Sequence, residues 1–361
     1  MQDRALRKVL LVRAIEETDR DGDALPLAER TEATRTVMGN NPPNVEIQVG
    51  APLSSATEWF LVRRADVLID ALRGRSPGID HVLAVAGGAT SLDRGLLAAG
   101  FALGAALSFF DGARGGINIF APPLVVLLVW NLLVYVFIGI RSSKVRIEST
   151  APGAANPEAL RESFVQPSGF GRFYARWVRR QVERLLGHST RFNAPLAPGL
   201  RRFAGDWLEL AQPLFFARAR RLLHLSAVFA AIGLVAGYYF RGFVLRSAAG
   251  WEGSGAIGPE TAHALLTVLY GPAALLSGIA VPAADGMAAL RWSAPSLSGV
   301  GEPAIWVHLI ALTAGLYIVL PRLVLTVLSA LRLWRLSRRL VLPPAIVSYL
   351  QTLVATVRSG A

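Results

Sequence analysis

Two arginines, a tryptophan and a glutamate that lie close together in the sequence are the residues best suited to form a charged site. The stretch GYYFRGFVLRSAAGWEG (237–253) follows a long apolar run and contains Arg241, Arg246, Trp251 and Glu252. An arginine can stack on an aromatic ring and can also pair with a carboxylate. We therefore treat these four residues as one candidate cluster.

The place of Arg241 at the end of an apolar run predicts how its charge is accommodated. The run 222–240 has 19 residues and closes with Tyr238, Tyr239 and Phe240, which is typical of a membrane-spanning helix that reaches the interface. An arginine at that level can extend into the lipid headgroups, so no buried charge is required. We also expect Arg241 or Arg246 to pair with Glu252 and so to hold the segment 255–303.

Few polar residues interrupt the apolar runs. Asn131 lies in the middle of one run and is a candidate for a hydrogen bond between helices, worth about 0.6–2 kcal/mol. Arg322 lies near the expected cytoplasmic end of another apolar run, 304–331. Small residues four positions apart allow helices to approach closely. Two such pairs occur, Gly100 with Gly104 and Gly233 with Gly237.

The segment GFGRFYARWVRRQVERLLG (169–187) has aromatic and basic residues at helical spacing. This composition is typical of a helix lying in an anionic headgroup layer, with aromatic residues below and arginines outward. Packing on a cytoplasmic core and docking of a partner are the alternatives. The candidate membrane-surface residues are Phe170, Phe173 and Trp177, with Arg172, Arg176 and Arg180.

The sequence lacks the residues that several kinds of chemistry require. The chain has no cysteine, which excludes disulfides and thiolate metal sites. The glycines of AVAGGATSLDRG (84–95) are not followed by the lysine of a phosphate-binding loop. The five histidines stand apart, without the spacing of a metal site. We therefore expect no catalytic residues, no cofactor and no metal.

The apolar residues are concentrated in blocks, and these predict an all-α integral membrane protein. Of the 361 residues, 53% are hydrophobic and only 17% are charged, fewer charges than a soluble domain usually carries. We expect four spans, at 95–110, 117–140, 222–245 and 304–331, with the turn DGARGG (111–116) joining the first two.

The distribution of arginine predicts the orientation of these spans. The net charge of +12 could indicate nucleic-acid binding, but in a chain with long apolar blocks it indicates basic segments retained on the cytoplasmic side. Residues 141–221 carry 15 basic and 6 acidic side chains, whereas 246–303 carry two and four. The expected cytoplasmic parts are a helical region at 1–94, the Arg-rich segment 141–221 and the tail 332–361.

The uncharged stretch 262–284 is long enough to span, but a fifth crossing would move the basic C-terminal segment outside. Gly271 and Pro272 also interrupt it, because proline removes a helical hydrogen bond. We expect two short helices that lie on or dip into the outer leaflet as part of an outer segment, 246–303. A small globular cap is the alternative.

Four stretches together resemble one bacterial inner-membrane family, a domain of unknown function. They are LLVRAIEETDRDGDALPLAER (10–30), YFRGFVLRSAAGWEG (239–253), HALLTVLYGPAALL (263–276) and WVHLIALTAGLYIVLPRLVL (306–325). Genes of this family often lie beside one for a GTPase-like, membrane-associated protein. The chain departs from the family after Gly-Trp-Glu, where GSGAIG (253–258) replaces bulkier residues. The resemblance implies an inner-membrane location and a GTPase-like partner, and it supplies no activity.

Three functions follow from these observations. The first is a non-enzymatic scaffold or receptor for a partner protein, held in a bilayer with anionic headgroups, with both termini in the cytoplasm. The second is an oligomeric channel or transporter component, for which a homo-oligomer of the chain would form the path. The third is an enzyme acting on lipid headgroups through Glu252, His263 and His308.

Overall fold

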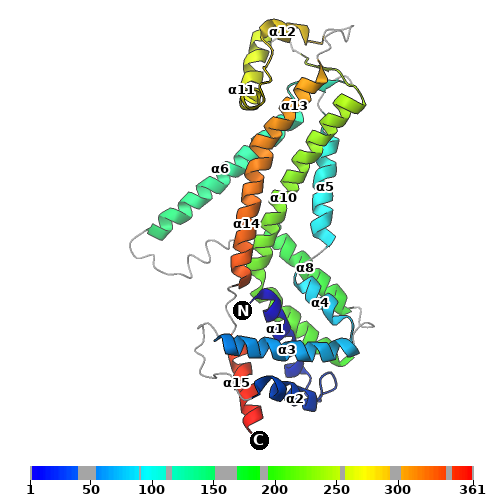
Figure 1. The fold of residues 1–361 in the computed structure, drawn as a ribbon, viewed down its shortest axis with the longest axis vertical. Coiled ribbons are helices and arrows are strands. Elements are labelled where there is room, and N and C mark those ends of the chain that lie inside the picture. Colours follow the sequence, from blue (N-terminus) through cyan, green and yellow to red (C-terminus); the bar gives the residue numbers. More distant parts are fainter. Residues whose placement is uncertain are drawn as a thin grey trace. The chain divides into compact units, whose positions relative to one another are not determined.

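The computed structural model describes nine stretches of the chain, and helices account for most of them (Figure 1). The predicted all-α fold is thus confirmed. Some predictions fall outside the described residues: His188, the outer residues 253–256 and 293–301, and all of the predicted turn 111–116 except Gly116. The described stretches are 2–39, 54–88, 91–110, 116–150, 169–187, 194–252, 257–292, 302–338 and 344–359.

The chain folds into two compact units. The first unit is assembled from three separate segments, Met1–Thr90, Pro167–Ala219 and Ser329–Ala361. The second unit comprises Ser91–Gln166 and Arg220–Leu328. Segments that are far apart in the sequence therefore meet within each unit.

The first unit consists of seven described α-helices. They are α1 (Asp3–Thr18), α2 (Leu27–Met38), α3 (Ser55–Arg75), α4 (Ile79–Ala86), α8 (Gly169–Gly187), α9 (Ala197–Leu210, after the 3-10 turn Ala194–Leu196) and α15 (Pro344–Ser359).

The second half of helix α1 lies at the centre of the first unit. All residues from Val9 to Ile15 are buried, Arg13 among them, whereas Arg4 in the first turn is exposed. Each large aliphatic side chain buried there contributes roughly 1.5–3 kcal/mol. The helix packs on α3 and α9, and Gly199 permits the approach of α9, since a side chain there would overlap Ile15.

The second unit contains the apolar helices. They are α5 (Ser91–Leu107), α6 (Pro122–Thr150), α10 (Gln212–Tyr239) with its π-helical continuation Phe240–Val244, α11 (Pro259–Ser277), α12 (Ala284–Ala289) and α13 (Pro303–Ala314), which the π-helical segment Gly315–Val319 joins to α14 (Leu320–Arg338). The first residues of α10 and the last of α14 belong to the first unit.

Three described helices, not the predicted four, are long and apolar enough to cross a membrane by length and composition. They are Pro122–Ile140, Gln212–Val244 and Pro303–Arg338. The predicted span 95–110 is too short, because α5 has 17 residues and so measures about 26 Å, against a hydrocarbon core of about 30 Å. The apolar run extends to Phe110, but its last three residues leave the helix.

Helices α5 and α10 are joined through glycines at four-residue spacing. A Cβ atom on Gly104 would overlap the carbonyl oxygen of Ala230, and one on Gly233 would overlap that of Phe101. Such close backbone contact is the usual role of small residues between membrane helices. Although α5 is short, it is therefore an integral part of the second unit.

Two short strands close the end of the second unit where α6 begins. Strand β1 (Ile117–Asn118) pairs in parallel with β2 (Ala249–Gly250), and a bridge follows between Trp251 and Arg291. Strands of two residues have no periodicity that a sequence could reveal. Only the folded chain shows them.

The predicted interruption of 262–284 at Gly271 and Pro272 is wrong, since α11 continues through Pro272 to Ser277. The helix ends instead at Gly278, which has a φ of +71°, a conformation that favours glycine. Proline removes one hydrogen bond, and here burial of the neighbouring Ala273 and Tyr270 maintains the helix.

Helix α11 has two apolar faces. Its inner face, which includes Leu266 and Tyr270, belongs to the core of the second unit. Its outer face is exposed to an extent unusual for a water-soluble surface, with Leu275 at 87% and Val268 at 80%. An apolar outer face of this kind is typical of a helix that contacts lipid.

Candidate functional site

A buried arginine joins three apolar helices of the second unit. Arg322 of α14 is 5% exposed, and its Nε donates to Oδ1 of Asn131 on α6 at 2.6 Å. Its Nη1 lies 3.0 Å from Nδ1 of His224 on α10. An ionisable side chain inside such a bundle is expensive to bury and commonly marks a functional site.

The partners of Arg322 are neutral. Because a guanidinium only donates, Nδ1 of His224 accepts, and the proton of a neutral imidazole then lies on Nε2. The Tyr135 ring lies 5.5 Å from the guanidinium carbon, and its hydroxyl donates to the Tyr317 carbonyl at 3.2 Å. No acidic side chain in the described part of the chain pairs with Arg322.

The local sequence explains how Asn131 reaches this position. Asn131 is 2% exposed, and its Nδ2 donates to the Leu127 carbonyl one turn earlier in α6 at 2.7 Å. This bond orients Oδ1 toward Arg322. The Tyr317 carbonyl lies in the π-helical segment Gly315–Val319, and such wider turns are frequent at functional sites.

Arg241 is buried, so the prediction that it extends into the headgroups is wrong. Its side chain is 4% exposed, donates to the carbonyls of Ser108 and Gly116, and stacks on Phe109 at 5.7 Å. The end of a helix leaves carbonyl groups without partners, and Arg241 binds one of them just beyond α5. Tertiary contacts from a distant segment thus satisfy the charge.

The other members of that predicted cluster lie in different surroundings. Arg246 is exposed and has a φ of +49°. Trp251 is fully buried, donates from Nε1 to the Met287 carbonyl at 2.9 Å, and is stacked by Arg291 at 5.5 Å. Glu252 is exposed. Pairing of Arg241 or Arg246 with Glu252 stays a prediction.

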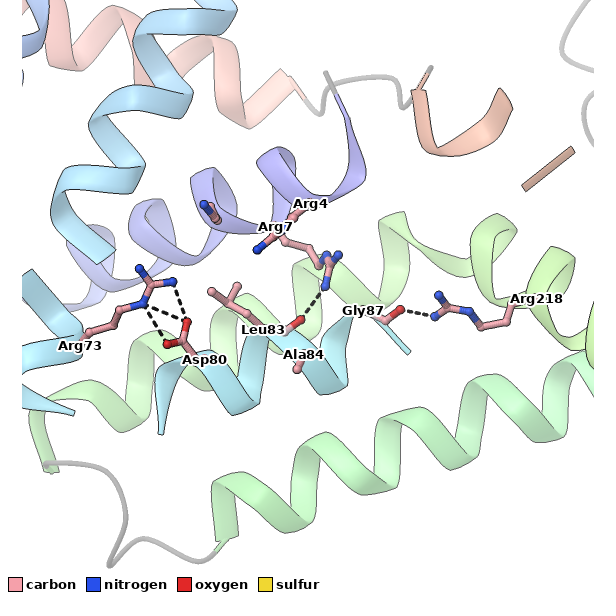
Figure 2. A pocket seen from close by; sticks show the side chains of 9 residues that line it. Arg4, Arg7, Arg73, Asp80, Leu83, Ala84, Gly87 and Arg218 are labelled. Carbon is pink, nitrogen blue, oxygen red and sulfur yellow. Dashed lines mark hydrogen bonds and ion pairs between the residues drawn. The ribbon is translucent and has the colours of Figure 1, made fainter. Parts of the chain in front are cut away.

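A basic pocket in the first unit was missed by the sequence analysis (Figure 2). Its volume is about 440 Å³. Five of the side chains around it are cationic and one is acidic. The lining residues are Arg4, Arg7 and Lys8 of α1, Arg73 of α3, Asp80, Leu83 and Ala84 of α4, Gly87 and Arg218.

Two arginines of this pocket bind the end of α4. Arg7 donates to the Leu83 carbonyl at 2.5 Å, and Arg218 donates to the Gly87 carbonyl (Figure 2). A Cβ on Gly87 would displace the guanidinium of Arg7, and one on Gly88 would displace that of Arg218, while the φ of +72° at Gly88 itself favours glycine. The glycine pair of AVAGGATSLDRG is thus a packing feature of an arginine-lined pocket.

Charge within the pocket is only partly compensated. Arg73 pairs with Asp80 at 2.7 Å, and Lys8 pairs with Asp66. Burial lowers the pKa of Arg7, and although Asp3 opposes this, the positive charges of Arg218 and Arg4 add to it. The pocket can therefore attract an anion.

A second buried network of hydrogen bonds joins four helices of the first unit, α1, α2, α3 and α15. Arg64 of α3 donates to Glu16 of α1 at 2.6 Å, to Thr34 of α2 at 2.7 Å and to the Tyr349 hydroxyl of α15 at 2.8 Å. Burial alone would lower the pKa of Arg64, but the Tyr349 hydroxyl and the Glu16 carboxylate raise it. Burial raises the pKa of Tyr349 well above its usual range, so the hydroxyl keeps its proton and donates to Glu16.

Helix α8 packs on the first unit with one face and exposes another. Tyr174, Val178 and Val182 are buried, and the Tyr174 hydroxyl donates to the Gly88 carbonyl at 3.2 Å. Of the predicted membrane-surface residues, Phe170 and Trp177 are half-buried, and the others are exposed. The exposed ones are Phe173, Arg172, Arg176 and Arg180. Contact of this second face with headgroups stays a prediction.

The histidines proposed for headgroup chemistry have separate partners. His308 bonds the Tyr239 hydroxyl at 2.7 Å, and His263 bonds the Pro282 carbonyl at 2.8 Å. Among the described residues no group of histidine and carboxylate side chains could hold a metal ion. The described contacts do not bring Glu252 and these histidines together.

Local sequence contained one signal for the pocket. Arg4, Arg7 and Lys8 recur at the three- and four-residue spacing that places them on one face of α1. Arg73 and Arg218 are distant in sequence, and no local pattern links them to that face. The Arg64 network is equally non-local, because Tyr349 follows Arg64 by 285 positions.

Comparison with known proteins gives no relative from which a function could be transferred. No protein-family model matches the chain. Neither a curated protein nor a solved structure matches it significantly.

Proposed function

We propose that the protein is a non-enzymatic, multi-pass scaffold or receptor of the bacterial inner membrane, and that its first unit binds a partner protein in the cytoplasm. The assembly of this unit from three segments that alternate with apolar helices carries the proposal. Its buried apolar core around Leu10 and Ile15 makes this unit a packed platform on which another protein can dock.

The same assembly supports a four-crossing arrangement. Because 1–90 and 167–219 belong to one unit, we place both on the same side of the membrane, which requires an even number of crossings between them. In this proposal α6 is one crossing and α5, short as it is, is the other. In the segment 220–328, α10 would be the third crossing and the continuous helix α13–α14 the fourth.

Charge and family resemblance support the cytoplasmic side for the first unit. The Arg-rich parts of the chain belong mainly to that unit or lie next to it, as the positive-inside rule requires of cytoplasmic segments. Both termini would then be cytoplasmic, and α11 would lie against the outer leaflet. The resemblance names a GTPase-like protein as the first partner to examine.

The exposed face of α8 is the proposed docking surface. Phe173 is 45% exposed, and Arg172, Arg176 and Arg180 surround it. Exposed aromatic and arginine side chains commonly dominate the binding energy at protein interfaces. The face would bind an acidic surface of the partner.

Partner capture from native membranes tests this function. We expect the tagged full-length protein to retain a stoichiometric partner, and Phe173→Ala with Arg176→Glu to lose it. Arg63→Glu, an exposed change on α3, is the matched control and should retain the partner. Recovery of the wild type alone from native membranes would contradict a receptor function.

The absence of cysteine allows a direct test of the topology. Single cysteines at Thr36, Arg201 and Gln351 of the first unit should be labelled only from the cytoplasm, and one at Glu260, in the first turn of α11, only from outside. All four positions are exposed. Labelling of Thr36 and Gln351 from opposite sides would exclude the arrangement.

The cluster around Arg322 favours a transporter or channel component as the second candidate. A buried cation with Asn131 and His224 beside it could bind an anion within the helices. Anion flux into liposomes that contain the purified protein, abolished by Arg322→Gln, would support this function. No flux under any gating condition would exclude it.

A further inference from the structure

We propose that the basic pocket of the first unit binds a phosphate-bearing ligand. This goes beyond the proposed function, because it assigns a ligand to the unit whether or not a partner docks on α8. The pocket is formed by α1, α3, α4 and Arg218 at the beginning of α10 (Figure 2).

The first support is an excess of positive charge. Arg4 is exposed and makes no ion pair with any described residue. Arg218 has the Gly87 carbonyl as its described partner, which leaves its charge without a carboxylate. Asp80 is the acid that lines the pocket, and Arg73 engages it with a bidentate bond at 2.7 and 2.9 Å.

The second support is that the arginines are held in place. Arg7 is positioned by the Leu83 carbonyl and by stacking over Trp207 at 5.6 Å. Its Nε is buried and, among the described residues, has no hydrogen-bond partner. A fixed guanidinium loses less conformational entropy when it binds a ligand.

Capping of α4 explains only part of this arrangement. Cations near a helix C-terminus interact favourably with its carbonyls, and Arg7 and Arg218 do so. Arg4 and Lys8 make no described contact with those carbonyls, yet they face the same pocket. Each capping arginine also has guanidinium donors beyond the one that binds the carbonyl.

Size and chemistry together indicate the ligand class. A volume of about 440 Å³ lies within the range of about 300–1,000 Å³ that is usual for small-molecule sites. Leu83 and Ala84 are the apolar side chains of the lining, so an acyl chain would find little contact there. Arginine forks match the oxygens of phosphate, which favours a phosphorylated headgroup or a phosphorylated small molecule.

Ligand binding by the full-length protein in detergent provides the test. The soluble probe is inorganic phosphate, compared with chloride at equal ionic strength and followed by thermal stability. The lipid probe is phosphatidylglycerol, compared with phosphatidylcholine by native mass spectrometry. The variants are Arg4→Gln and Arg4→Gln with Arg218→Gln, and the matched control is Arg63→Gln on the exposed face of α3.

We expect the wild type and the control to bind at least one probe specifically. Arg4→Gln changes an exposed residue and should weaken binding several-fold without changing the fold, as judged by circular dichroism. The double variant should weaken it about tenfold or more, since each charge-assisted bond is strong. Binding of phosphate alone indicates a soluble ligand, and binding of phosphatidylglycerol alone indicates a lipid.

Two results would overturn the proposal. One is failure of the wild type to bind either probe, and the other is equal binding by the wild type and the double variant. Capture of a partner by the double variant separates this site from the docking function. Retained capture with lost phosphate binding would leave the receptor proposal intact.

Discussion

Nε of Arg322 lies 2.6 Å from Oδ1 of Asn131, inside the second unit. This bond joins α14 to α6, a helix that diverges from α10 and α14 and leaves most of its surface exposed (Figure 1). A charge-assisted hydrogen bond in an apolar surrounding is stronger than one in water. This bond therefore helps to hold α6 against α14, together with the Tyr135–Tyr317 hydrogen bond and the apolar contacts of Leu124.

Asn131→Leu should destabilise the protein by about 1–3 kcal/mol, because it leaves the Nε–H group of Arg322 buried without its acceptor. The midpoint of thermal unfolding in detergent measures this. Trp130→Leu, at an exposed position on the same helix, should have little effect. Adding Arg322→Leu to Asn131→Leu should restore part of the stability. A double variant that is no more stable than Asn131→Leu would show that the pair is not coupled.

Gly104→Ala should destabilise the protein by roughly 2 kcal/mol or more, because the new methyl group overlaps the Ala230 carbonyl between α5 and α10. Gly95→Ala is the matched control on α5, since a Cβ there meets open space. It should be neutral or stabilising by up to about 1 kcal/mol, through the higher helix propensity of alanine. Thermal unfolding of both variants decides the question, and equal midpoints would contradict the close packing.

Tyr349→Phe should loosen α15 from the first unit. The change removes the acceptor of an Arg64 hydrogen bond and the donor to Glu16, and we expect a loss of about 1–3 kcal/mol. Limited proteolysis should then cleave the segment 344–359 faster. Gln351→Ala, at an exposed position on the same helix, should leave the cleavage rate unchanged.

Asp19 should make the first unit sensitive to acid. Burial would raise its pKa, but hydrogen bonds from the Leu25 and Ala24 backbone and the nearby Arg30 guanidinium outweigh burial and lower it. The folded pKa therefore lies below the unfolded value of about 3.9. The contribution of Asp19 is complete above that pH and is lost as the pH falls through the folded pKa.

Asp19→Asn should accordingly reduce stability by about 1–2 kcal/mol at pH 7, with a smaller difference from the wild type near pH 3. Thermal unfolding at both pH values measures the two differences. Asp21→Asn, at an exposed position in the same loop, is the control and should behave like the wild type at both. A difference for Asp19→Asn that grows on acidification would reverse the sign assigned to its pKa.

Hydropathy and composition were sufficient to predict an all-α chain with long apolar helices. Hydropathy is a property of consecutive residues. The apolar runs around Asn131 and before Arg241 can therefore be recognised without knowing what packs against them. The prediction failed at the ends of elements, where α5 stops before Phe110 and α11 continues through Pro272. Those ends depend on contacts from elsewhere in the chain.

Which charges meet could be decided only by the tertiary structure. Arg241 was expected at the headgroups, yet it is buried and donates to carbonyl groups that lie more than 120 positions earlier in the sequence. Arg7 and Arg218 converge on α4, and Arg64 reaches Tyr349, across separations that no local pattern spans. The free energy of placing a charge depends on every dipole around it in space. Only a few of those dipoles belong to residues that are close in the sequence.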